Sequence, residues 1–158
     1  MIPRTLLLAT TIAAGAVVVA CSDTTAPKQL ESAEPAPSLI RSGALNLTKD
    51  CSAYTGQAGD TCTVTTSNLA QIEPGSTIIY ASAAVGAALD TDVRLDPPGP
   101  GNNVAYGHCT LSLATGVGLC TFSGGTGKFT WFHANAAVSY VSGPTFAWDG
   151  TYSFSPRD

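Results

Sequence analysis

The chain has 158 residues, of which 44% are hydrophobic and only 11% are charged, and its formal net charge is -4. That length allows one ordinary domain, and the low charged fraction together with 16 glycines argues against a coiled coil or a charged helical bundle. An acidic chain with 7 Lys and Arg residues carries too little positive charge to bind a phosphate backbone, so we expect no nucleic-acid partner.

The N-terminus has the layout of a secretory signal. Residues 1–20 carry a basic start at Arg4 and then an uncharged run from Thr5 to Ala20. A transmembrane helix needs about 20 apolar residues, and this shorter run is interrupted by threonines and a glycine. The sequence therefore predicts an exported protein with a cleaved signal peptide over residues 1–20.

The end of this segment, Val18-Val19-Ala20-Cys21, closely resembles the lipobox of bacterial lipoproteins. The resemblance implies cleavage before Cys21, lipidation of its sulfur and a permanent membrane anchor in the cell envelope. Ser22 stands where inner-membrane lipoproteins of Gram-negative bacteria carry Asp, which favours the outer membrane. The alternative is an ordinary signal with a chance cysteine, which gives a secreted protein.

Cysteine parity supports the lipoprotein interpretation, because setting Cys21 aside leaves an even number for an oxidising compartment. Residues 21–42 then contain three prolines and few groups to bury, which predicts a disordered tether after the lipidated cysteine. Residues 43–158 are long enough for a single folded domain.

This domain is predicted to be all-β. Short runs rich in Val, Ile, Thr, Tyr and Phe recur between Gly, Pro, Asn and Asp, and only Ser82–Leu89 is Ala-rich enough to be ambiguous. Eight such runs with hairpin-sized gaps indicate an antiparallel sandwich or barrel. The expected strands are 44–48, 61–66, 76–83, 91–95, 103–113, 117–123, 127–141 and 145–154.

One hairpin predicts a disulfide. If a two- or four-residue loop joins the strands around Ala114-Thr115-Gly116, Cys109 and Cys120 lie directly opposite each other, about 4.5 Å apart at Cα. A three-residue loop would misalign them. Four cysteines allow three connectivities, and we favour this one, with Cys51–Cys62 as the second bridge. Metal binding is disfavoured because neither a C-x₂-C spacing nor a nearby His pair occurs.

The segment Phe122-Ser123-Gly124-Gly125-Thr126-Gly127-Lys128-Phe129 satisfies neither the Walker pattern nor the dinucleotide fingerprint. We interpret it as a tight turn, with the next strand resuming at Lys128. It resembles the F-x-G-G-T-G-x-F signature of the allene oxide cyclase and dirigent barrel superfamily, which implies an eight-stranded barrel able to hold hydrophobic small molecules. We therefore predict a barrel, with a β-sandwich as the alternative. The following residues, Thr130 to Ala134, depart from the dirigent pattern, and no catalytic residue of the family is carried over.

The strand near 91–95 carries a weak metal candidate. Asp90, Asp92 and Asp96 fall on one face with Arg94, and a turn-rich loop follows, so these oxygens could hold calcium. We favour a solvent-facing edge, because Arg94 partly neutralises the carboxylates. No metal and no cofactor are expected.

Candidate ligand-binding residues are the two histidines and two tryptophans, His108, His133, Trp131 and Trp148. Packing is the default role for the aromatic residues, although in a barrel one alternate set lines a cavity. The histidines lack a metal-site spacing, and no G-x-S-x-G elbow supports a catalytic triad.

The function predicted is a non-enzymatic envelope lipoprotein that binds a small apolar molecule or a partner protein. The alternative is a barrel enzyme acting on a lipophilic small molecule, which requires His108, His133 or Asp149 to line a cavity.

Overall fold

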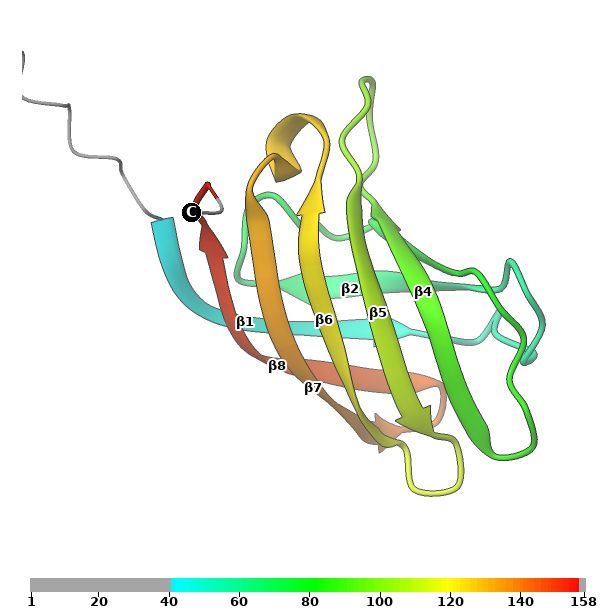
Figure 1. Cartoon of the computed structure of the whole chain (residues 1–158). Coiled ribbons are helices and arrows are strands. Elements are labelled where there is room, and N and C mark those ends of the chain that lie inside the picture. The colour runs from blue at the N-terminus through cyan, green and yellow to red at the C-terminus, as the bar shows by residue number, and fades with distance from the viewer. Residues whose placement is uncertain (1–40, 157–158) are drawn as a thin grey trace, which may run out of the picture. The chain divides into compact units, whose positions relative to one another are not determined.

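The computed structural model describes residues 41–156, and these form an all-β domain. Consecutive strands pair antiparallel, and β8 pairs with β1, so the sheet closes into an up-and-down barrel (Figure 1). The predicted barrel is thus confirmed over its sandwich alternative. Its elements in chain order are β1 (Arg41–Asp50), β2 (Thr61–Ser67), β3 (Thr77–Tyr80), β4 (Ala88–Asp96), β5 (Ala105–Ser112), β6 (Val117–Gly125), the 3₁₀ helix η1 (Gly127–Phe129), β7 (Phe132–Ser142) and β8 (Thr145–Phe154).

The connecting loops alternate between the two ends of the barrel because successive strands run in opposite directions. The end where β1 finishes, here named the Lys49 end, carries loops 51–60, 81–87, 113–116 and 143–144. The end where β1 starts, here named the Arg41 end, carries loops 68–76, 97–104 and 126–131. In Figure 1 the loop 97–104 projects at the top and the turn 113–116 lies at the bottom.

The interior is filled by alternate residues of each strand, as expected for a small barrel. In β1, for example, Leu45, Leu47 and Lys49 are buried while the residues between them are not. Towards the Arg41 end the core is an aromatic cluster, whose members are Phe122, Phe129, Phe132, Phe154 and Trp148.

Both predicted disulfides are confirmed. Ser112 pairs with Val117 around a four-residue loop, so Cys109 and Cys120 lie opposite each other with their Cα atoms 4.1 Å apart. Gly116 closes that loop at φ 68°, a backbone conformation that favours glycine. The second bridge, Cys51–Cys62, joins the end of β1 to the start of β2.

Most strand boundaries differ from the sequence prediction by a few residues, and three differences have a clear origin. β7 begins at Phe132 and not at residue 127, because residues 127–129 close into η1, where Asn103 accepts a hydrogen bond from the Lys128 backbone N–H. The Ala-rich window 82–89 holds a turn and the first residues of β4. β1 begins at Arg41, two residues inside the expected tether, because Arg41 pairs with Phe154 of β8.

The predicted signal peptide over residues 1–20, the lipidation of Cys21 and all but the last two residues of the predicted tether over residues 21–42 lie outside the described residues. Within residues 41–156, no helix has the length and apolar character needed to cross a membrane.

Candidate functional site

Lys49 is a lysine inside the barrel. It follows Leu45 and Leu47 at the two-residue period of β1, so the strand turns its side chain inward. Only 2% of the residue is exposed. A fully buried lysine is rare unless its charge is paired, which makes this residue the most unusual feature of the core.

The contacts of Lys49 are aromatic. Its Nζ donates a hydrogen bond to the Tyr80 hydroxyl oxygen at 2.6 Å and lies 4.4 Å from the centroid of the Trp148 ring. Among residues 41–156, no carboxylate forms an ion pair with it. Burial therefore lowers the Lys49 pKa from 10.5 to about 7.

A small apolar pocket adjoins Lys49 at the Lys49 end. Its volume is about 30 Å³, enough for a water molecule or a small polar head group. It is lined by Lys49, Cys51, Tyr54, Cys62, Tyr80, Leu89, Leu111, Leu113 and Phe146. The Tyr54 hydroxyl is buried without a hydrogen-bond partner. Because burying an unpaired hydroxyl costs free energy, this group is available to an incoming polar atom.

The loop 51–60 holds Tyr54 over this pocket. The Cys51–Cys62 disulfide fixes the base of the loop, and the Tyr54 ring contacts the Tyr80 ring edge-on at 5.2 Å between centroids. Asp60 accepts hydrogen bonds from the backbone N–H groups of Thr55 and Gln57. These bonds to the carboxylate lower the Asp60 pKa. The disulfide, the ring contact and the hydrogen bonds to Asp60 thus hold the loop in place over the pocket.

Exposed apolar side chains gather around the same end of the barrel. They lie in the loops 81–87 and 113–116, at the start of β6 and near the end of β7. The residues are Val85, Leu113, Val117, Tyr140 and Val141. We name this set the apolar rim.

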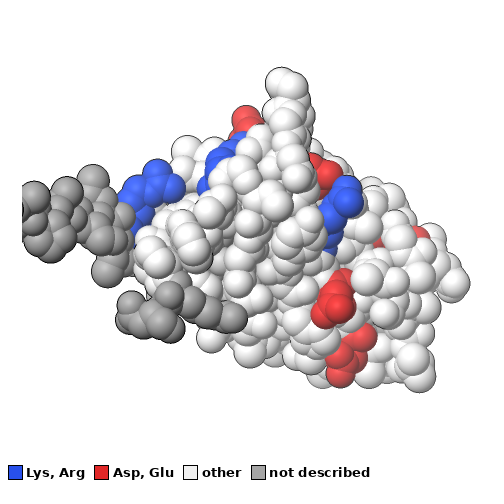
Figure 2. Space-filling view, turned by 45° about the horizontal axis from the view of Figure 1, so that its top comes forward, with Lys and Arg blue, Asp and Glu red and all other residues white. Residues whose placement is uncertain are grey.

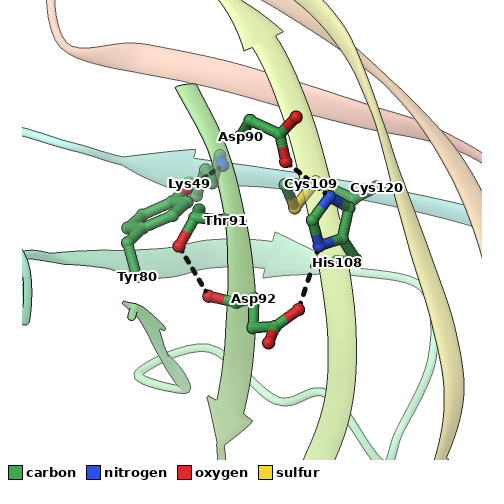
Figure 3. Close-up of a disulfide and its surroundings, with 8 residues drawn as sticks. All are labelled: Lys49, Tyr80, Asp90, Thr91, Asp92, His108, Cys109 and Cys120. Atoms are coloured by element: carbon green, nitrogen blue, oxygen red, sulfur yellow. Dashed lines mark hydrogen bonds and ion pairs between the residues drawn. A yellow bond between two sulfur atoms is a disulfide. The ribbon is translucent and has the colours of Figure 1, made fainter. Parts of the chain in front are cut away.

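The aspartates of β4 form a different arrangement on the outside of the barrel. His108 of β5 lies between Asp90 and Asp92, with Nε2 and Nδ1 each 2.9 Å from a carboxylate oxygen. The hydrogen bond to Asp92 is the main reason that the His108 pKa is raised. Figure 3 draws His108 with dashed lines to Asp90 and Asp92, which are exposed, whereas Lys49 and Tyr80 are buried.

Asp96 pairs instead with Arg94 at 2.9 Å, and within residues 41–156 no cluster of three metal-ligating side chains is found. The face drawn in Figure 2 carries few charged side chains, and its lysines and arginines stand apart from one another.

The four predicted ligand-binding residues are not brought together. His108 lies on the outer surface, and His133 lines a shallow outer depression across β1, β7 and β8. Trp131 is 54% exposed at the Arg41 end, whereas Trp148 is fully buried beneath Lys49. Asp149 is exposed and accepts a hydrogen bond from the Asn46 side chain. None of His108, His133 and Asp149 enters the barrel interior.

Sequence reasoning missed Lys49, Tyr54 and Tyr80. The signal for Lys49 was its alternation with Leu45 and Leu47, but the strand was expected to end at residue 48, two positions before its end at Asp50. Tyr80 shares the alternation of Ile78 within a predicted strand. No sequence pattern indicates that Tyr54, a loop residue, folds back over the pocket.

The fold and the site together define a small disulfide-bonded β-barrel with a buried amine near one end. Comparison with protein-family models, with curated proteins and with solved structures finds no match for this chain.

Proposed function

We propose that this protein is a non-enzymatic binding module of the cell envelope, which takes a small apolar molecule by a carbonyl or anionic head group at Lys49. The observation that carries the proposal is a buried lysine, without a carboxylate partner among the described residues, beside an apolar pocket. Such a lysine costs folding free energy, so a role in binding explains its presence better than a role in stability.

The size of the pocket divides the ligand into two parts. About 30 Å³ accommodates the head group alone. The apolar part of the ligand would extend out of the pocket past Leu113, which both lines the pocket and belongs to the apolar rim. Polar groups that fix orientation and apolar surface that supplies affinity are the usual division of labour in ligand sites.

Head-group selectivity tests this function. The probes are decanoate and decyltrimethylammonium, titrated calorimetrically into the mature chain with Cys21→Ser, which removes the lipid acceptor. We expect decanoate to bind at pH 6, and Lys49→Met to weaken it at least tenfold, because the carboxylate loses its cation. Lys128→Met is the matched control, since Lys128 lies at the Arg41 end. Equal affinity of Lys49→Met and the parent chain would contradict the proposal.

The membrane anchor is the second part of the proposal and rests on the lipobox resemblance at Cys21. Arg41 lies at the opposite end of the barrel from the pocket. Fractionation of cells tests the anchor: we expect the parent chain with the membranes and Cys21→Ser in the soluble envelope fraction. Recovery of both in the soluble fraction would contradict it.

A further inference from the structure

We infer that Lys49 captures the carbonyl group of an aldehyde or ketone as a covalent imine, held inside the barrel at the small apolar pocket. The inference rests on the proposed function and names the ligand chemistry of the same site. It starts from the geometry: an amine nitrogen beside an apolar cavity, a tyrosine hydroxyl 2.6 Å away, and no carboxylate paired with it among residues 41–156.

The surroundings of Lys49 favour the neutral amine, which is the nucleophilic form. Trp148, Tyr80 and Phe146 present aromatic rings to its Nζ, and these solvate a cation far less well than water does. Desolvation in an apolar pocket is the usual means by which proteins activate a lysine for attack on carbonyl carbon. The low pKa that results supports the same conclusion.

The reaction is balanced by groups already in place. The Nζ lone pair attacks the carbonyl carbon, and the oxygen receives a proton to form a carbinolamine. Loss of that oxygen as water leaves a C=N bond, so the two protons released by nitrogen depart in the water molecule. The Tyr80 hydroxyl is placed to relay them, because it lies within hydrogen-bond distance of Nζ.

The imine costs less free energy to bury in the pocket than the protonated lysine does. An imine nitrogen is a neutral acceptor, so Tyr80 can donate its hydroxyl proton to it while the buried positive charge disappears. The carbonyl carbon then occupies the 30 Å³ space, and its substituent extends towards Leu113.

Reductive trapping tests the inference on the full chain. The probe is butanal with sodium cyanoborohydride at pH 7, followed by peptide mapping of the only three lysines, Lys28, Lys49 and Lys128. We expect butylation of Lys49 at least tenfold faster than of Lys128, a lysine paired with Glu73. Labelling of Lys49 at or below the rate of Lys128 would overturn the inference, and the measurement needs no variant to fold.

Tyr80→Phe examines the positioning role of the hydroxyl, since it keeps the ring against Tyr54. We expect slower capture and a shifted pH profile of labelling, whereas a purely structural role would leave the profile unchanged. The decanoate titration separates the two proposals. Decanoate binding without Lys49 labelling would overturn the carbonyl inference alone, and Lys49 labelling without decanoate binding would overturn only the apolar-ligand function.

Discussion

At the scale of single residues, Lys49 sets how stability depends on pH. Its folded pKa is about 7 against an ordinary 10.5, so the unfolded chain binds one more proton between these values. The free energy of unfolding therefore rises with pH in that window, by up to about 1.4 kcal/mol per pH unit. Below pH 7 both states are protonated and the full cost of burying the charge remains.

Lys49→Met should remove this slope and raise the free energy of unfolding at pH 6 by about 2 kcal/mol, after allowing for the Tyr80 hydroxyl left unpaired. Urea unfolding at pH 6, 7, 8 and 9 measures both effects, and Lys128→Met serves as a control that keeps the slope. The same slope in Lys49→Met and the parent chain would show that another group titrates. A variant that gains stability while losing decanoate binding is the signature of a functional lysine.

His108, on the outer surface, gives the opposite dependence of stability on pH from that of Lys49. Asp92 and Asp90 raise its pKa, so the pairs stabilise the fold below the ordinary His pKa and the benefit disappears as pH rises through the raised value. Because the side chain is 46% exposed, the gain is small, about 0.2–1 kcal/mol at most. Titration of the His108 ring by NMR should show a fall in pKa for Asp92→Asn and for Asp90→Asn, since both carboxylates raise it. An unchanged pKa in either variant would contradict this assignment.

At the scale of strands, Gly150 determines how closely β7 and β8 approach. A side chain there would collide with the backbone of Asn135 and Ala136 on the neighbouring strand. Gly150→Ala should therefore destabilise the barrel by about 2 kcal/mol through overpacking. Ser139→Ala, at an exposed position of β7, should change the free energy of unfolding little. Thermal or urea unfolding of the two variants gives the comparison, and equal stability would show that the strands can separate without cost.

The Cys51–Cys62 disulfide joins two elements and also bounds the pocket. Replacing both cysteines by alanine should cost about 2–4 kcal/mol of unfolding free energy, and Cys109→Ala with Cys120→Ala should cost a similar amount. Only the first pair should weaken decanoate binding, because only that bridge fixes the loop carrying Tyr54. Equal loss of binding in both double variants would indicate a general effect of stability.

The elements themselves could be predicted from sequence because each carries a local signal. All eight strands were expected, and the structure confirms the register with Cys109 opposite Cys120, which a two- or four-residue loop predicts. The exception was the start of β7, where a 3₁₀ turn depends on Asn103, a residue distant in sequence. The pocket was not predictable for the same reason: Lys49, Tyr54 and Tyr80 belong to different elements, and only barrel closure brings them together.

At the scale of the whole molecule, the length of pairing between neighbouring strands differs around the barrel. β1 pairs with β8 along its full length, Arg41 to Asp50, whereas the β2–β3 ladder runs only from Thr61 to Thr63, with a few flanking backbone hydrogen bonds on either side. Local opening is expected where few backbone hydrogen bonds must break. The β2–β3 seam also carries two pocket residues, Cys62 and Tyr80, so opening there would admit a ligand to Lys49.

Hydrogen exchange followed by mass spectrometry tests this uneven closure. Amides of β3 should exchange fastest among the strands and those of β8 slowest, because β8 is paired along its length on both sides. If the seam is the entry to the pocket, reductive butylation of Lys49 should slow exchange in β3 without altering β8, since a filled pocket favours the closed state. Uniform exchange of all eight strands would mean that the barrel opens only by global unfolding, and Lys49 would then be reached through the apolar rim.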